Sequence, residues 1–220
     1  MTPKRVTLFA GHYGSGKTNI AVNYAMHLKR IGFPVVIADL DIVNPYFRTK
    51  DSENELQEQG IELICSEFAN TNLDIPSLPQ SMYRVVHDKN VYAVMDIGGD
   101  DAGAVALGRF APFINDENNY EMFFVANFFR PLTRTAEEAF AVMKEIEAAS
   151  SMRFTGIINN SNLGELTTVQ DVVSTNEKAL QLCNLSGLPL AFTSANVSVA
   201  GGLKGTVDSV FSLTLQKKFY

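Results

Sequence analysis

The chain has no tryptophan, and only two cysteines and three histidines occur among its 220 residues. Cys65 and Cys183 lie far apart and no C-x-x-C pair occurs, so neither a zinc ribbon nor a cysteine-ligated iron–sulfur cluster within one chain is indicated. Isolated cysteines in apolar surroundings are typical of core residues in a reduced protein. We therefore expect two core cysteines and a cytoplasmic localisation.

Long apolar runs and an excess of basic residues are also missing. No stretch of about 18 apolar residues occurs, as a membrane-spanning helix would need. The first apolar run, residues 6–10, leads directly into a glycine-rich segment and is too short for the core of a signal peptide. The net charge of −6 argues against a general binder of nucleic acid or anionic membranes. We expect no transmembrane segment, and the sequence carries no strong signal for nucleic-acid binding.

The rest of the composition is that of a folded globular domain. Hydrophobic residues make up 46% of the chain and charged residues 19%, which are ordinary values for such domains. Apolar runs suited to buried strands alternate with segments of helical spacing, and no internal repeat interrupts them. We therefore predict one domain over residues 1–220, with a three-layer α/β fold: a mostly parallel, twisted sheet of about seven strands with helices on both faces.

The expected elements follow from hydrophobic spacing and turn residues. Strands are predicted at 4–10, 35–38, 61–65, 91–95, 122–127, 154–158 and 188–192. Helices are predicted at 18–31, 51–59, 78–88, 102–113, from 135 onward, from 168 onward and over 206–218. We interpret the apolar stripe in the last of these as the face of a packed terminal helix rather than a membrane anchor.

The segment Gly11–Thr18, GHYGSGKT, matches the phosphate-binding pattern G-x-x-x-x-G-K-[ST] and lies between a predicted strand and a predicted helix. Its glycines allow the backbone to turn its N–H groups toward an anion, and the following helix adds the positive end of its dipole. Lys17 is expected to reach the β- and γ-phosphates and Thr18 to ligate Mg²⁺. The alternative is a glycine turn that binds nothing. The predicted nucleotide-binding residues here are Gly11, His12, Tyr13, Gly14, Ser15, Gly16, Lys17, Thr18 and Asn19.

Carboxylates follow two other predicted strands. Asp39 and Asp41 end the second strand, and Asp96 ends the fourth. Ligands of open α/β sheets bind at the carboxyl ends of the strands, and a hydrophobic strand that ends in Asp is the Walker B pattern for holding Mg²⁺. Gly99, three residues after Asp96, could offer its amide to the γ-phosphate. The alternative for Asp96 is an N-cap of the next helix.

These motifs together resemble the MinD/ParA/CobQ-type branch of P-loop NTPases, which also contains nitrogenase iron protein and the Mrp-like ATPases. The resemblance covers nearly the whole chain and includes Asn160, at the end of a late strand. It implies that Lys17 and Asp41 are catalytic, with Asp41 orienting the attacking water, and that Asn160 contacts the adenine. The implied metal shell is Thr18, Asp39, Asp41 and Asp96. The implied function is a Mg²⁺-dependent ATPase that works as a nucleotide-driven switch, with ATP and ADP as ligands and an unidentified protein partner.

The sequence departs from this family at one position of the loop. Many members carry a second lysine just after the first glycine, which acts across a dimer that sandwiches ATP. His12 stands there in this chain, and histidine is a weaker, pH-dependent cation. A homodimer therefore remains open, as does a catalytic charge from Arg48 or Arg130.

Three other functions remain as alternatives. An ATP-dependent small-molecule kinase or ligase of the CobB/dethiobiotin synthetase type would need an acceptor pocket. A GTPase would need the N/T-K-x-D guanine motif, but neither Asn159 nor Asn160 has an aspartate three residues later. A non-hydrolysing scaffold is disfavoured by the full set of acids. For the kinase or ligase alternative, the candidate residues of the acceptor pocket are Asn44, Tyr46, Arg48, Asp100 and Asp101.

Overall fold

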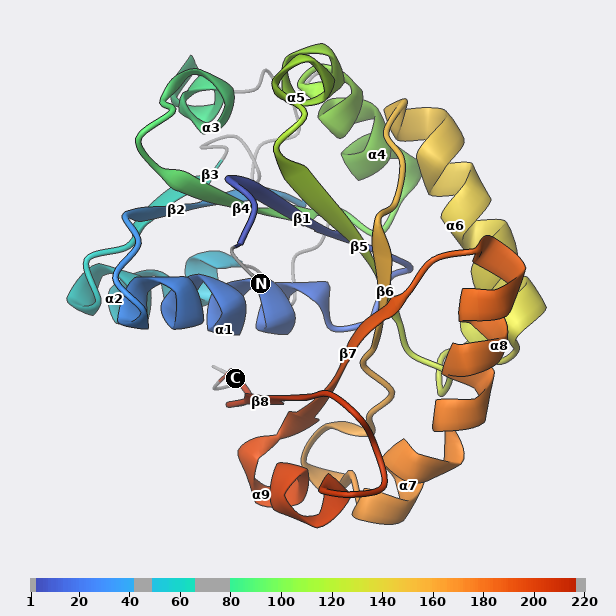
Figure 1. Ribbon diagram of the computed structural model, residues 1–220. Coiled ribbons are helices and arrows are strands. Elements are labelled where there is room, and N and C mark those ends of the chain that lie inside the picture. Colours follow the sequence, from blue (N-terminus) through green and yellow to red (C-terminus); the bar gives the residue numbers. More distant parts are fainter. Residues whose placement is uncertain (1–2, 42–48, 66–79, 217–220) are drawn as a thin grey trace.

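The computed structural model describes residues 3–41, 49–65 and 80–216, in which one eight-stranded sheet is covered by helices on both faces (Figure 1). The strand order is β3-β2-β4-β1-β5-β6-β7-β8, and every neighbouring pair is parallel. The strands are β1 (Val6–Ala10), β2 (Val35–Leu40), β3 (Glu62–Cys65), β4 (Tyr92–Ile97), β5 (Tyr120–Ala126), β6 (Gly156–Asn159), β7 (Leu190–Asn196) and β8 (Val210–Leu213). The predicted three-layer parallel fold is confirmed, with one strand more than expected.

Most helices lie close to the predicted positions. They are α1 (Lys17–Arg30), α2 (Glu53–Glu58), α3 (Arg84–His87), α4 (Asp101–Gly108), α5 (Ala111–Glu117), α6 (Ala136–Ser150), α7 (Val169–Ser174), α8 (Asn176–Ser186) and α9 (Val197–Ala200). Two predicted helices are each divided in two, the second of them, from 168 onward, into α7 and α8, and α9 was not predicted. The single helix predicted over 102–113 is wrong, because α4 ends at Gly108 and a new helix, α5, begins with a proline in its first turn. Proline lacks the N–H that an interior position needs, so it favours a helix start.

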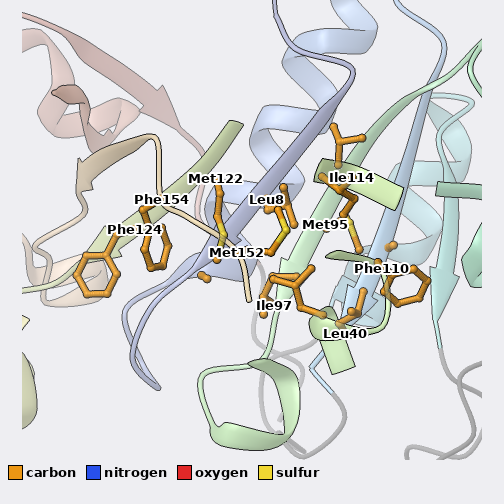
Figure 2. Packing of buried hydrophobic residues seen from close by; sticks show 14 of the residues in the cluster. Leu8, Leu40, Met95, Ile97, Phe110, Ile114, Met122, Phe124, Met152 and Phe154 are labelled. Atoms are coloured by element: carbon orange, nitrogen blue, oxygen red, sulfur yellow. The ribbon is translucent and has the colours of Figure 1, made fainter. Parts of the chain in front are cut away.

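The two faces of the sheet bury different sets of side chains. On β1, Leu8 packs toward α3–α6 and α8, whereas Phe9 packs toward α1 and α2. Figure 2 shows Leu8, Met95 and Met122, from three adjacent strands, gathered on the first of these faces with Phe110 and Ile114. Since both faces are covered, the central strands are almost continuously apolar. The polar residues that interrupt this pattern therefore need a separate reason to be there.

The predicted C-terminal helix over 206–218 is wrong. Residues Val210–Leu213 form β8, which pairs in parallel with β7 and makes the edge of the sheet. The Phe211 ring lies against Tyr24 and His27 of α1, at centroid distances of 6.3 and 5.9 Å. A short apolar run fits both helical and strand spacing, and here pairing with an open sheet edge decides between them.

The segment after β8 is attached to the first turns of α1. The Asn23 amide donates to the Thr214 carbonyl and accepts from the Thr214 N–H, each at 2.9 Å, as a neighbouring strand would. The Gln216 N–H donates to the side-chain oxygen of Asn19 at 3.1 Å, and the Gln216 side chain donates to the Ser52 hydroxyl at 2.6 Å. The end of the described chain therefore spans from α1 to the turn before α2.

The two cysteines, predicted as core residues, are less buried than the core. Cys65 and Cys183 are both half-buried, and no disulfide joins them. Cys183 packs at the margin of the larger apolar cluster rather than within it. In the part of the chain that the structure describes, no helix is both long enough and apolar enough to cross a membrane.

Candidate functional site

The segment Gly11–Thr18, here called the P-loop, connects the carboxyl end of β1 to the first turn of α1. Gly14 and Gly16 have φ values of 75° and 88°, in the left-handed region that favours glycine, and Gly16 caps α1. The Ser15 N–H donates to the His12 carbonyl at 3.1 Å and closes the turn. A Cβ on Gly11 would lie 2.5 Å from the Val125 carbonyl oxygen, so β5 also requires glycine there. These positions confirm the predicted strand, glycine turn and helix.

Lys17 is the first residue of α1 and its side chain is buried in the loop. Its ammonium donates to the His12 carbonyl at 3.4 Å. Burial lowers the pKa of the ammonium, and the nearby carboxylates of Asp96, Asp41, Asp100 and Asp39 act in the opposite direction. Burying a cation among carboxylates costs free energy, because the charged groups lose their hydration. Such arrangements are typical of sites that bind a strongly charged ligand.

Asp96 lies within β4 and is completely buried. One of its oxygens, Oδ2, accepts a hydrogen bond from the Thr49 hydroxyl at 3.1 Å. The other, Oδ1, is buried with no hydrogen-bond partner among the described residues. Burial raises the pKa of the Asp96 carboxyl to about 6, while Lys17 and the hydroxyls of Thr18 and Thr49 favour the charged form. The N-cap of α4 is Asp100 rather than Asp96, since the Asp100 carboxylate accepts from the Gly103 N–H at 2.9 Å.

Asp39 and Asp41 approach Asp96 from the neighbouring strand. Asp39 stands beside Asp96 in the β2–β4 register, and its carboxylate accepts the Asp41 N–H at 2.8 Å. Both aspartates are buried, at 6% and 7% exposure. The D-L-D sequence therefore brings two acids to the carboxyl edge of the sheet, where the P-loop also lies.

The residues present fit a Mg²⁺ ion that is held together with phosphates. Among the described residues, no three His, Cys, Asp or Glu side chains are close enough to form a metal cage on their own. Mg²⁺ at nucleotide sites needs no such cage, because one or two carboxylates, a hydroxyl and phosphate oxygens complete its shell with water. The unpartnered Asp96 Oδ1 and the adjacent Thr18 hydroxyl supply such a pair. Asp39 and Asp41 stay predicted members of the shell.

The turn after β4 is packed tightly against the P-loop. A Cβ on Gly99 would lie 2.7 Å from the Tyr13 nitrogen and 2.9 Å from the Lys17 ammonium. A Cβ on Gly103 would lie within 2.5–2.8 Å of three backbone atoms of Gly98. Glycine at these positions thus lets α4 and the turn approach each other and the loop.

The close approach of α4 to Gly98 predicts a pair of opposite stability effects in one helix. Gly103→Ala is expected to lower the free energy of unfolding by about 2–3 kcal/mol. The new Cβ would clash with backbone atoms of Gly98, which cannot move aside as a flexible side chain could. Gly108→Ala should leave the free energy of unfolding unchanged or raise it by up to about 1 kcal/mol, since its Cβ would lie 3.6 Å from its nearest neighbour. Urea unfolding of both variants measures the difference. Equal effects would contradict the described packing.

Burial of Asp96 predicts a pH effect on the unliganded protein. An unfolded aspartate has a pKa of about 3.9, and the folded value is about 6. The proton-linked stability is therefore fully present below about pH 4 and is lost as the pH rises through about 6. Asp96→Asn removes this loss, so its gain in unfolding free energy over the native protein should be larger at about pH 7.5 than at about pH 4.5, by of order 2 kcal/mol. Denaturant melts without nucleotide or Mg²⁺ test this, and a gain that does not change with pH would refute it.

The remaining predicted residues are placed at the rim of the loop. The half-buried His12 ring lies 2.9 Å from the Tyr13 carbonyl, and Tyr13 is 51% exposed. Asn19 faces the C-terminal segment, through its hydrogen bond with Gln216. Asn160, at 4% exposure, lies against the P-loop backbone. Of the candidates for an additional charge, Arg130 donates to the Gly14 carbonyl at 2.8 Å.

Several predicted residues lie outside what the structure describes, and others were missed. Arg48, Asn44 and Tyr46 fall outside the described residues, as does the side chain of Asp101. Thr49, whose hydroxyl donates to the Asp96 carboxylate, was not predicted because no sequence motif marks it. Ser194 was also missed as a site residue. Its position at the end of a late strand is the signal that could have indicated it.

Comparison with known proteins finds no matching family model and no similar curated protein. Solved structures do match. The cell division protein FtsY from Thermotoga maritima has a TM-score of 0.62 at 17% identity, over 88% of this chain and 62% of that one. Chloroplast FtsY from Physcomitrella patens has a TM-score of 0.56 at 18% identity, over 88% and 58% of the two chains.

A third structure is the signal recognition particle 54 kDa protein from Aeropyrum pernix in complex with GDP, with a TM-score of 0.54 at 15% identity over 88% and 41% of the two chains. The chain has the P-loop NTPase fold. It spans less than two thirds of the length of each of these structures. Sequence identities this low establish only the fold of this chain. The narrower resemblance to the MinD/ParA/CobQ-type branch stays a prediction.

Proposed function

We propose that this chain binds ATP with Mg²⁺ and hydrolyses it to ADP and phosphate, working as a nucleotide-driven switch. The observation that carries the proposal is the buried Lys17 beside Asp96, whose Oδ1 is also buried and has no hydrogen-bond partner among the described residues. A cation and a free carboxylate oxygen held side by side at a P-loop suit the two charges of a magnesium–triphosphate group. A loop that served only as a turn would not need a buried ammonium or a buried carboxylate oxygen beside it.

Each residue of the site has a role in this proposal. The loop amides and Lys17 bind the phosphates, and Thr18 and Asp96 hold the ion, with Asp39 supporting them. When bound, the ion neutralises charge that develops on the phosphate oxygens during transfer. Asp41 orients the attacking water and accepts its proton as the bond between the γ-phosphorus and the bridging oxygen breaks. ADP then leaves with the electron pair of that bond on its terminal phosphate.

The switch would act through the two segments that follow the carboxylates. The glycine turn after Asp96 lies against Tyr13 and Lys17 of the loop, so loss of the γ-phosphate would change its contacts. The chain after Asp41, the second proposed switch segment, lies outside the described residues. A protein partner would read these segments. The side chain of His12 at the rim of the loop is where a second copy would meet the nucleotide, if the protein acts as a homodimer.

Adenine is proposed as the base because the guanine-specific carboxylate has no equivalent three residues after Asn159 or Asn160. A site that lacks the acceptor for a base-edge donor pair discriminates poorly in favour of guanine. The small-molecule kinase alternative receives no support, because its predicted pocket residues are not described, apart from Asp100, which caps α4.

The proposal is tested first on the unmodified protein. Calorimetric titration with ATP, ADP and GTP, with and without Mg²⁺, should give binding of ATP that Mg²⁺ strengthens. The concentration of released phosphate should then rise with time only when ATP and Mg²⁺ are both present. A complete absence of binding heat for adenine nucleotides would overturn the proposal, and tight binding of GTP alone would correct the base.

A further inference from the structure

The Asn160 side chain connects the P-loop to strand β7 at the carboxyl edge of the sheet. Its amide nitrogen donates to the Ser15 carbonyl of the P-loop at 2.7 Å, and its amide oxygen accepts from the Ser194 hydroxyl at 2.7 Å. A backbone carbonyl only accepts, so the nitrogen end of the amide must face Ser15. Asn160 and Ser194 are 4% and 1% exposed. Both ends of this amide are therefore used inside the protein, and little of its surface remains for a nucleotide base.

The contact with Ser15 fixes the direction of one N–H of the loop. In a planar trans peptide the carbonyl and the following N–H point in opposite directions. Holding the Ser15 carbonyl toward Asn160 therefore turns the Gly16 N–H away from Asn160. Arg130 holds the preceding carbonyl, that of Gly14, at 2.8 Å. Two successive peptide groups of the P-loop are thus oriented by side chains from the segments that follow β5 and β6.

Glycine at position 16 allows this contact as well as the turn. A Cβ on residue 16 would clash with the Asn160 amide nitrogen, because the two atoms would be closer than real Cβ atoms approach any neighbour. Gly16 is also in the left-handed region, at φ 88°. The P-loop glycine and Asn160 therefore fit each other as a pair.

The support behind Asn160 is rigid. Its own N–H donates to the Ala126 carbonyl of β5 at 2.8 Å, and its carbonyl accepts from the Asn162 side chain at 2.7 Å. A side chain held this firmly is suited to positioning a neighbour rather than adapting to a ligand.

We propose that Asn160 is a positioning residue of the P-loop, which aims the Gly16 N–H at the phosphates, and that it does not read the base. The inference rests on the proposed triphosphate site. It departs from the family resemblance, which implies that Asn160 contacts the adenine.

A ligand without a base separates the two roles. Inorganic tripolyphosphate, ATP and GTP are titrated, each with Mg²⁺, into the native protein and Asn160→Ala. We expect all three to bind about tenfold more weakly to the variant, a change of 1.4 kcal/mol, with the ratio of ATP to GTP affinity unchanged. Asn160→Asp, of the same shape but with no donor toward Ser15, should lose at least as much. Ser194→Ala, which frees the other end of the amide, should weaken all three ligands about threefold.

Asn159→Ala is the matched control, because it removes an equally buried amide whose side-chain hydrogen bonds go to Thr175 and Ser161 rather than to the P-loop. It should lower Tm but change the affinity for tripolyphosphate by less than about twofold. If Asn160→Ala fails to fold, Ser194→Ala decides by the same criteria.

Three results would overturn the inference: unchanged affinity of Asn160→Ala for tripolyphosphate, a changed ATP-to-GTP ratio, or an equal loss in Asn159→Ala. A native protein that binds none of the three ligands would instead overturn the proposed function.

Discussion

Replacing Lys17 by alanine is expected to weaken ATP binding by about a hundredfold or more. The ammonium is buried among carboxylates, and its hydrogen bonds to phosphate would be charge-assisted, each worth about 1.5–3 kcal/mol. Losing two of them corresponds to about a hundredfold at 1.4 kcal/mol per tenfold. Calorimetric titration with ATP and Mg²⁺ measures the loss directly.

The matched control for this variant lies on the same helix. Lys29 of α1 donates to the Gly60 carbonyl at 3.0 Å on the surface of the protein, far along the helix from the loop. Lys29→Ala changes the net charge by the same amount and should leave ATP affinity within about twofold, since exposed charges are screened. If Lys17→Ala bound ATP as well as Lys29→Ala, the loop would not be the phosphate site.

Replacing Asp41 by alanine should separate binding from turnover. Its carboxylate is proposed to act on the attacking water rather than on the nucleotide, so ATP affinity should stay within about threefold of the native value. Phosphate release should fall by about a hundredfold or more, the usual contribution of a positioned acid–base group. Binding is measured by calorimetry and turnover by the rate of phosphate release under saturating ATP.

Asp116, an exposed aspartate near the end of α5, provides the control for Asp41. Asp116→Ala also removes one carboxylate and should alter neither quantity. A slow Asp41→Ala variant with unchanged affinity supports the proposed role. Turnover at the native rate would assign the water to another group, and a large loss of affinity would show that Asp41 acts mainly in binding rather than in turnover.

The sequence predicted those parts of the fold that depend on local pattern. The loop glycines and the two aspartates at the end of β2 lie where they were predicted, and the helix predicted from 135 onward begins at a capping box of Thr135 and Glu138. Each depends on residues close together in the chain, whose geometry is set by backbone sterics or by a short hydrogen-bonded ring.

What could not be predicted depends on long-range pairing. β8 was predicted as a helix because its apolar residues fit both periods, and only the open edge of β7 selects a strand. Thr49 and Asp96 are 47 positions apart in the chain, and no spacing rule connects them. The Asn160–Ser15 contact spans 145 positions. Such contacts follow from strand order, which the sequence pattern alone leaves undetermined.

The position of β1 has a consequence for how the protein reaches its native state. In the sheet Val6 stands opposite Ala93 on one side and Tyr120 on the other, so β1 gains both of its neighbours only after β5 has been synthesised. Sheets built from such distant partners fold slowly and expose apolar strands meanwhile. On the ribosome, the apolar side chains of β1 would remain accessible to chaperones until β4 and β5 emerge.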